Sequence, residues 1–327
     1  MAQRSRGEEI EARAGVVLGA LVADAAAMGL HWLYDPERIA SIADEREPVF
    51  LAAERRHFDD AKGYFAHEGK RSGELSQYGS TLMLAMDSLV ATEGALDIAD
   101  FQRRYVAFFG PGGAWKGYVD RPTRGTLGHL GTEINGDTPE VSGIDDDQMP
   151  AFSTTPAMVA AGPGSLSLER DVMRMVRVTN DNPLATEGAL IVARVTTALL
   201  QGDDLAATLA TEAERAGDVL QPLLREALAA EDQSSIDIAG HFGRACHVPQ
   251  GLPVVFHIAN KAESYESAIR SNVLAGGDSC GRSMALGAIL GAHFGFGGER
   301  GMPLPWLTRL EGGARLFDQA YRLAAFS

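Results

Sequence analysis

Apolar residues recur at helical spacing along most of the 327-residue chain. In the segment 75–90, positions 75, 78, 82, 86 and 89 share one face of a helix, which predicts a core helix there. The same periodicity predicts further helices at 8–29, 98–109, 155–161, 168–179, 183–201, 204–215, 217–230, 262–273, 281–295 and 313–325. Alternating apolar and polar positions, which are typical of β-strands, are nearly absent.

The remaining segments are mostly predicted to be loops. The segments 110–128 and 131–156 are rich in Gly, Pro, Asp and Thr, and ligand contacts often lie in such loops. The short apolar segment 253–258 cannot be assigned to helix or strand by its period alone. No repeat of fixed length is evident, so a solenoid is not expected. The predicted fold class is therefore all-α, a compact orthogonal multi-helix bundle.

Composition supports one large globular domain over residues 1–327. Hydrophobic residues make up 45% of the chain, enough for a sizeable core, and the charged fraction of 22% is ordinary for a globular protein. Composition does not shift sharply anywhere along the chain, which gives no reason to divide it.

Charge and targeting signals restrict the expected partners and location. The net charge of −15 argues against nonspecific binding to nucleic acid or an anionic membrane. Two cysteines, Cys246 and Cys280, are predicted to be free thiols in a reducing compartment. The first apolar run, 15–30, is interrupted by Asp24, lacks a cleavage site and is shorter than the ~20 residues of a spanning helix. A cytoplasmic location is expected, and the pattern indicates no oligomeric state.

A Gly-Gly-Asp sequence near the C-terminus is the first motif that could carry chemistry. Asp278 opens a small-residue helix in which Gly287 and Gly291 lie four residues apart, so another backbone could approach closely. A carboxylate and Arg282 at a helix N-terminus suit ligand binding, because the free N–H groups favour anions there. Alternatively, Asp278 only caps the helix, and Arg282 forms an internal ion pair rather than neutralising a phosphate or carboxylate of the ligand.

The second motif is an early helix that carries an acidic residue among apolar ones. An unpaired carboxylate at Asp24 would be costly to bury, so Asp24 is predicted to have a partner. His31, Trp32 and Tyr34 follow about two turns later and could line a pocket or simply belong to the core.

The third motif is the polar turn 73–81, which enters the core helix at 75–90 and contains Tyr78. In this turn, Ser80 and Thr81 could cap the helix or bind a metal ion.

Three further groups of polar residues match known ligand patterns only in part. They are the set His241, Cys246, His247 and His257, the acidic run 145–147, and the glycine-rich segment 110–118. The first matches no common zinc spacing, the second lacks the Gly and Glu of an EF-hand, and the third has no Ser or Thr after its lysine. All three groups are expected to be structural.

Together, the three motifs resemble the ADP-ribosylglycohydrolase superfamily, and in particular its divergent branch that includes J1-type crystallins. His-Trp-x-Tyr-Asp and Tyr-Gly-x turns recur in that branch, and the likeness spans residues 15–295 in order. The resemblance implies an all-α fold, two bound magnesium ions, and hydrolysis of the bond between C1″ of ADP-ribose and a protein side chain or another leaving group.

The sequence departs from the family pattern at the expected metal ligands. Where the pattern reads Thr-Asp-Asp, this chain has Tyr78, Gly79 and Ser80. Where it reads Asp-x-Asp-Thr, Asp278 is kept but is followed by Cys280 and Gly281. The glutamate that some members carry after the first motif falls at His31.

These departures leave the metal content open. Magnesium prefers oxygen ligands in octahedral geometry, and Asp278 with Ser80 and Thr81 would hold it poorly. Cys280 and His31 would favour zinc, but two ligands do not complete a zinc site. Magnesium therefore stays an uncertain cofactor, with Asp278, Ser80 and Thr81 as its candidate ligands.

Two functional hypotheses follow. In the first, the chain is a divergent hydrolase of an ADP-ribosyl, nucleoside or related glycosidic substrate, in which Asp278 or Asp24 is the acid or base. Its predicted substrate contacts are His31, Trp32, Tyr34, Tyr78, Cys280 and Arg282; Cys280 could instead be a nucleophile, with His31 as its base. In the second, the chain is a silent member that binds a nucleotide-like ligand or is structural, as the crystallin branch is inferred to be.

Overall fold

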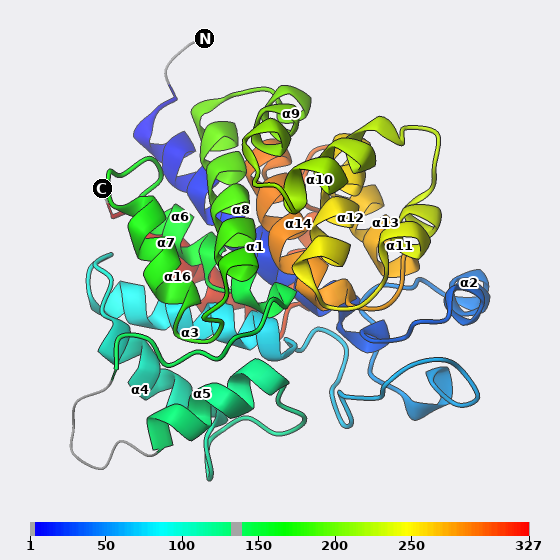
Figure 1. The fold of residues 1–327 in the computed structure, drawn as a ribbon, viewed down its shortest axis with the longest axis horizontal. Helices are drawn as coiled ribbons and strands as arrows, with labels where there is room; N and C mark the ends of the chain where they lie inside the picture. The colour runs from blue at the N-terminus through cyan, green and yellow to red at the C-terminus, as the bar shows by residue number, and fades with distance from the viewer. Residues whose placement is uncertain (1–3, 132–138, 327) are drawn as a thin grey trace.

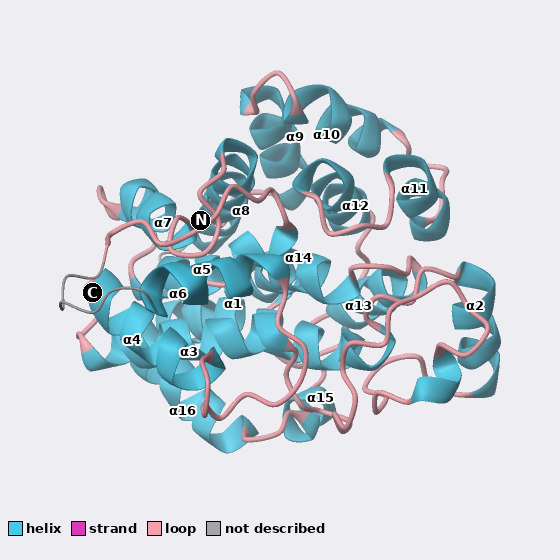
Figure 2. Cartoon of the chain, turned by 60° about the horizontal axis from the view of Figure 1, so that its bottom comes forward, coloured by secondary structure: helices cyan, strands magenta, loops and turns pink. Residues whose placement is uncertain are grey.

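The structure is a computed structural model that describes residues 4–131 and 139–326. Its helices are α1 (Arg6–Ala27), α2 (Pro36–Glu45), α3 (Gln77–Ala91), α4 (Ile98–Phe109), α5 (Arg121–Gly131), α6 (Thr155–Ala161), α7 (Leu168–Val176), α8 (Pro183–Gln201), α9 (Leu205–Arg215), α10 (Leu220–Ala229), α11 (Ser235–Phe242), α12 (Val248–Asn260), α13 (Tyr265–Leu274), α14 (Ser279–Phe294), α15 (Leu304–Arg309) and α16 (Gly313–Ala324). Within the described residues, extended pairing is limited to isolated bridges, and Figure 2 shows helices joined by loops. The predicted all-α class is confirmed.

Helices α1 and α14 form the centre of the molecule (Figure 1). Their contact surfaces are almost entirely small or apolar residues, buried from residue 14 of α1 and throughout α14 as far as residue 292. Helices α6 and α16 pack against α1, while α8, α12 and α13 pack against α14. The remaining helices cover this inner layer, so the core is continuous around the α1–α14 pair.

Four glycines allow α1 and α14 to pack at very close range. A Cβ atom added to Gly15 would lie 2.9 Å from the Gly291 carbonyl oxygen, and one added to Gly19 would overlap the carbonyl of Gly287. Because Gly15 faces Gly291 and Gly19 faces Gly287, the two helices run antiparallel. The close approach predicted from the spacing of Gly287 and Gly291 is found, and α1 is the partner.

Most helices lie where the periodicity predicts them, and the helices that it missed are short. The structure adds α2, α5, α11 and α15, which are short, and it shows that the ambiguous segment 253–258 belongs to α12. Helix α5 lies partly in the segment 110–128, which was predicted to be a loop because of its glycines. Its Pro122 is compatible with the first turn of a helix, where no N–H partner is required. Part of the predicted loop 131–156, residues 132–138, lies outside the described residues.

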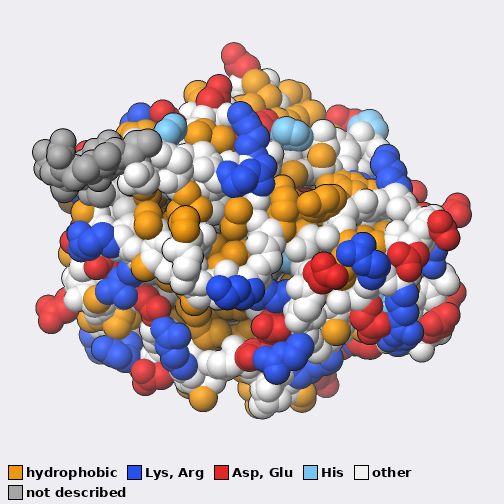
Figure 3. All heavy atoms as spheres, turned by 90° about the horizontal axis from the view of Figure 1, so that it is seen from below, with side chains coloured by type: hydrophobic (Ala, Val, Ile, Leu, Met, Phe, Trp, Pro, Cys, Tyr) orange, Lys and Arg blue, Asp and Glu red, His pale blue; other side chains and the backbone are white. Residues whose placement is uncertain are grey.

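In the part of the chain that the structure describes, two helical segments reach the length and hydropathy of a membrane-spanning helix: Arg6–Leu30 and Pro183–Gln201. The first is longer than the apolar run 15–30 because its polar first turns are also helical. Its apolar window is 94% buried inside the protein, as expected for a central core helix. On the face seen in Figure 3, acidic and basic side chains are interspersed around a band of hydrophobic ones.

The close contact between Gly19 and Gly287 predicts how one added methyl group changes the stability of the protein. We expect Gly19→Ala to lower the free energy of unfolding by about 1–3 kcal/mol, because the new Cβ forces the α1 and α14 backbones apart. Gly7→Ala is the matched control in the same helix, since no atom lies within 4 Å of its added Cβ. Chemical denaturation of both variants measures the difference; equal stabilities would contradict the proposed packing.

Candidate functional site

The three motif segments converge where α14 begins. The antiparallel packing brings the start of α14 beside the end of α1, and the chain then continues into the turn at residues 31–34. Backbone hydrogen bonds join this turn to the Gly-Gly-Asp sequence: Trp32 N donates to Gly277 O at 2.8 Å, and Gly277 N donates to Leu33 O at 2.7 Å. Gly277 has φ +69°, and a Cβ there would overlap the Arg244 carbonyl, so this turn requires glycine.

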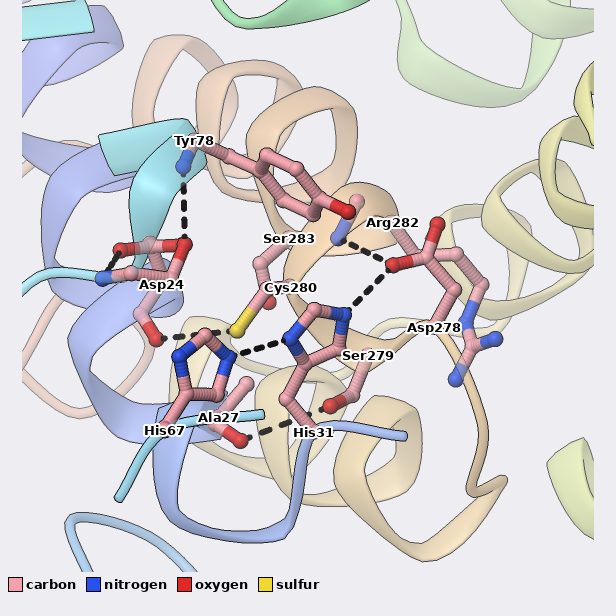
Figure 4. A network of polar contacts seen from close by, with 12 residues as sticks. Asp24, Ala27, His31, His67, Tyr78, Asp278, Ser279, Cys280, Arg282 and Ser283 are labelled. Carbon is pink, nitrogen blue, oxygen red and sulfur yellow. Dashed lines mark hydrogen bonds and ion pairs between the residues drawn. The ribbon is translucent and has the colours of Figure 1, made fainter. Parts of the chain in front are cut away.

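Asp278 caps α14 and is held by a histidine (Figure 4). Its Oδ1 accepts hydrogen bonds from Gly281 N at 3.1 Å and from His31 Nε2 at 2.9 Å. Asp278 is fully buried, yet its Oδ2 has no hydrogen-bond partner among the described residues. Because buried polar atoms are nearly always paired, this oxygen marks a position where a ligand group or water would bind.

A second histidine, His67, extends this hydrogen-bonded chain. His31 Nδ1 lies 2.7 Å from His67 Nε2, and both rings are buried. Burial lowers the pKa of His67 well below its ordinary value, so His67 is neutral and its Nε2–H can donate to His31 while His31 donates to Asp278. Sequence reasoning missed His67, because it stands in a loop without a recognisable motif.

Asp24 has the partner that its burial requires. Ser76, which caps α3, donates from its backbone N to Asp24 Oδ2 at 2.8 Å and from its hydroxyl to Oδ1 at 2.5 Å. Burial raises the pKa of Asp24 to about 6, although the hydrogen bonds from Ser76 oppose this. Both oxygens are therefore occupied in fixing α3 to α1, and a role of Asp24 in catalysis stays a prediction without support from these contacts.

The predicted aromatic residues do lie around His31. The ring centroids of Trp32 and Tyr78 lie 4.6 and 5.4 Å from that of His31. The Tyr78 hydroxyl and Trp32 Nε1 are buried without hydrogen-bond partners among the described residues. Trp32 also has φ +64°, a costly conformation for a non-glycine residue that clusters at functional sites. Tyr34 is less buried, and burial followed by the charge of Asp278 raises its pKa.

Cys280 and Arg282 are both buried, but their contacts are internal. Burial raises the pKa of the Cys280 thiol well above its ordinary value, and its Sγ lies 3.7 Å from the Asp24 carbonyl oxygen. That environment does not support a nucleophilic thiolate. Arg282 donates to Asn272 Oδ1 at 2.7 Å and to the Gly276 carbonyl at 2.6 Å, so it stabilises the turn before Asp278 instead of forming an ion pair. Its contact with a substrate stays a prediction.

A further carboxylate, Asp120, was missed in the sequence. It immediately precedes α5, and its Oδ1 accepts a hydrogen bond from Thr123 N at 2.8 Å, while its backbone N donates to Gln77 Oε1 at 2.9 Å. Asp120 Oδ2 is buried without a partner among the described residues, and burial raises the pKa of the carboxyl. Asp followed two residues later by Pro122 is a helix-start signal that could have identified it.

Comparison with known proteins shows the family and agrees with the all-α fold. A family model described as ADP-ribosylglycohydrolase matches residues 7–326. The chain belongs to the ADP-ribosylglycohydrolase family. Among its relatives in this family are crystallin J1A and crystallin J1B of Tripedalia cystophora, 26% and 24% identical to it over 94% and 97% of each chain, respectively. A solved structure titled as an ADP-ribosylglycohydrolase-related protein complex has a TM-score of 0.73 at 21% identity, covering 98% of this chain and 99% of that one, and so shows the same fold.

The residues present in this family member do not fit the magnesium pair that the resemblance implies. Thr81 donates its hydroxyl to the Gln77 carbonyl one turn earlier, at 3.0 Å, and Ser80 lies buried within α3, which is capped by Ser76 rather than by either predicted residue. Asp278 Oδ1 is occupied by His31. Within the described ranges, no three His, Cys, Asp or Glu side chains group as metal ligands do.

The groups expected to be structural have separate partners in this family member. His247 pairs with Asp147 at 2.6 Å, and His257 lies 3.2 Å from the Ala227 carbonyl oxygen, so they do not form a common ligand set. The acidic run 145–147 is not a simple solvent-exposed loop, because Asp146 is buried and pairs with Arg121 at 2.5 Å. This ion pair joins the start of α5 to the loop before α6.

The burial of Asp24 predicts a pH-dependent stability. The folded chain retains the Asp24 proton up to about pH 6, whereas an unfolded chain releases it near 3.8, so the folded state binds more protons between these values. We expect the wild type to lose up to about 3 kcal/mol of stability relative to Asp24→Asn as pH rises from about 4 to 7. Chemical denaturation across this range measures the difference, and a pH-independent difference would contradict a raised pKa.

Proposed function

We propose that this ADP-ribosylglycohydrolase family member hydrolyses an N- or O-glycosidic bond of an ADP-ribosyl, nucleoside or related substrate, using two carboxylates and no magnesium pair. The observation that carries the proposal is that Asp278 and Asp120 each cap a helix with one oxygen and leave the other buried without a partner among the described residues. Helix caps fix a carboxylate in position, and an unpaired oxygen on each is available for a reacting group.

The electrostatic effects of Asp278 and Asp120 on two other side chains support the proposal that both carboxylates belong to one site. Burial is the main cause that raises the pKa of Tyr78, followed by the charges of Asp278 and Asp120. The pKa of the Cys246 thiol is raised by burial and then by Asp278, with Asp120 contributing in the same direction. Since the charges of both carboxylates act on the same two side chains, we propose that Asp278 and Asp120 border one region, which Tyr78 and Cys246 also border.

The environments of the two carboxylates suggest different roles. Burial favours the protonated form of Asp120, which suits a general acid that donates its proton to the leaving group. Asp278, oriented by His31, suits the base that removes a proton from water as the water oxygen bonds to the anomeric carbon. The glycosidic bond breaks, the leaving group departs with the proton from Asp120, and Asp278 retains the proton from water. Tyr78 would contact the substrate through its unpaired hydroxyl.

A second candidate function is ligand binding without turnover. The specific observations in its favour are the two crystallin relatives and the two family aspartates that are replaced here by Gly79 and Ser80. In this case the same unpaired polar atoms would bind a nucleotide-like ligand. Calorimetry with ADP-ribose separates the two functions: binding without release of ADP-ribose from any modified peptide favours the second, and release favours the first.

The carboxylate roles predict distinct kinetic effects. With ADP-ribosylated arginine and serine peptides as substrates, we expect Asp278→Asn to lower kcat by about 10²–10⁴-fold, because amide nitrogen cannot act as the base. Asp120→Asn should lower kcat most for substrates with poor leaving groups, which need the acid. Asp318→Asn, an exposed residue of α16, is the control. Full activity in Asp278→Asn would contradict the assignment.

A second prediction concerns metal dependence. Because Asp278 Oδ1 and the Thr81 hydroxyl already have protein partners, and the described residues contain no group of three His, Cys, Asp or Glu side chains that could hold a metal ion, we expect a chelator to leave both ADP-ribose binding and peptide turnover unchanged. Turnover is compared after treatment with EDTA and after adding magnesium back. Activity that is lost with EDTA and restored by magnesium would refute a magnesium-independent site.

A further inference from the structure

Residues 34–63 form an excursion, a segment whose two ends lie side by side. A small pocket lies within this excursion. The excursion is closed at its base by the backbone hydrogen bond from Tyr34 N to Lys62 O, at 2.7 Å, and by the bridge between Leu33 and Gly63. Helix α2 forms one wall, and the short 3₁₀ turn Arg55–His57 forms the other. The cavity between them has a volume of about 130 Å³, room for roughly four water molecules at about 30 Å³ each.

Three arginines line this pocket in a chain whose net charge is −15. Arg56 pairs with Glu54, but within the described residues neither Arg38 nor Arg46 forms an ion pair with a carboxylate. The Arg38 guanidinium donates to the carbonyl of Asp59, at 2.7 Å, which holds α2 against the turn. Two guanidinium groups thus remain without a counter-ion at one small cavity.

His57 provides a second observation at the same pocket. It is 5% exposed, and its Nδ1 is buried without a hydrogen-bond partner in the described part of the chain. Burial lowers the pKa of the imidazole; the charge of Glu54 opposes this shift, and the guanidiniums of Arg56, Arg46 and Arg38 add to it. A neutral imidazole can donate a hydrogen bond from Nδ1 to a bound anion.

The remaining lining residues restrict which anion fits. Ser41 presents a hydroxyl, and Ile42 provides an apolar surface. Glu45 also lines the pocket, and its carboxylate can accept a hydrogen bond only from an anion that carries a proton. Hydrogen phosphate has such a proton, whereas sulfate and the dianion of a phosphomonoester do not. Arginine forks match phosphate oxygens in geometry and charge.

We infer that the pocket between α2 and the turn Arg55–His57 is a binding site for inorganic hydrogen phosphate, held by Arg38 and Arg46 and selected by Glu45. The bound ion would link α2 to the turn Arg55–His57 and so stabilise the excursion, which follows directly after the turn that contains His31. The site is separate from the proposed glycosidic chemistry and does not depend on it.

Calorimetric titration of the full chain with inorganic phosphate at constant ionic strength tests the site. We expect one phosphate to bind, and Arg46→Ala to weaken binding by about tenfold or more. Arg55→Ala is the matched control, because this neighbouring arginine is exposed, pairs with Glu68 and does not line the pocket. Thermal unfolding of each variant without phosphate checks that the fold is retained.

Further titrations identify the bound ion and test whether phosphate binds at the candidate active site instead. Sulfate and ribose 5-phosphate should bind about tenfold more weakly than phosphate to the wild type, and Glu45→Gln should remove the preference over sulfate. Asp278→Asn should bind phosphate like the wild type. The inference is overturned if the wild type does not bind phosphate or if Arg46→Ala binds it unchanged. Equal affinity for sulfate, or loss of phosphate binding in Asp278→Asn alone, overturns it as well.

Discussion

The glycine contact between α1 and α14 is the constraint on which the candidate site depends. With Gly15 and Gly19 against Gly291 and Gly287, the two backbones approach so closely that their register cannot slip without a clash. The antiparallel direction then brings the start of α14 beside the end of α1. The turn that follows α1 can therefore hydrogen-bond to the Gly-Gly-Asp sequence, and residues more than 240 positions apart become neighbours, as His31 and Asp278 are.

The hydrogen bonds of the buried aspartates distinguish a structural carboxylate, Asp24, from the candidate functional ones, Asp120 and Asp278. Asp24, Asp120 and Asp278 are all removed from water, which is costly unless their oxygens are paired. Ser76 satisfies both oxygens of Asp24, so that residue acts as a link between helices. Asp120 and Asp278 are each satisfied on one oxygen only. The unpaired oxygens have a cost in stability, and such a cost is retained where a site binds or transforms a ligand.

The sequence predicted the features that depend on local pattern and missed those that depend on distant contacts. Helical periodicity located α4, α6 and α8 at their observed bounds, and the spacing of Gly287 and Gly291 predicted a close helix pair. No local pattern distinguishes His67 from any surface histidine, because its role arises only when the fold brings it to His31. The same holds for the partner of Asp24, which lies 52 residues away, and for Arg282, whose partners are carbonyl and amide oxygens.

The altered motif residues form a consistent alternative to a metal centre. Where the family pattern has a glutamate, His31 places an N–H against Asp278, and where it has paired aspartates, Gly79 and Ser80 carry no charge. Removing carboxylates removes the negative charge that a divalent cation would otherwise balance. The single carboxylate left at this position is compensated by an imidazole N–H and by the N-terminus of α14, both fixed by the fold. An aspartate introduced at position 80 would thus add a buried negative charge, while His31 would still occupy Asp278 Oδ1.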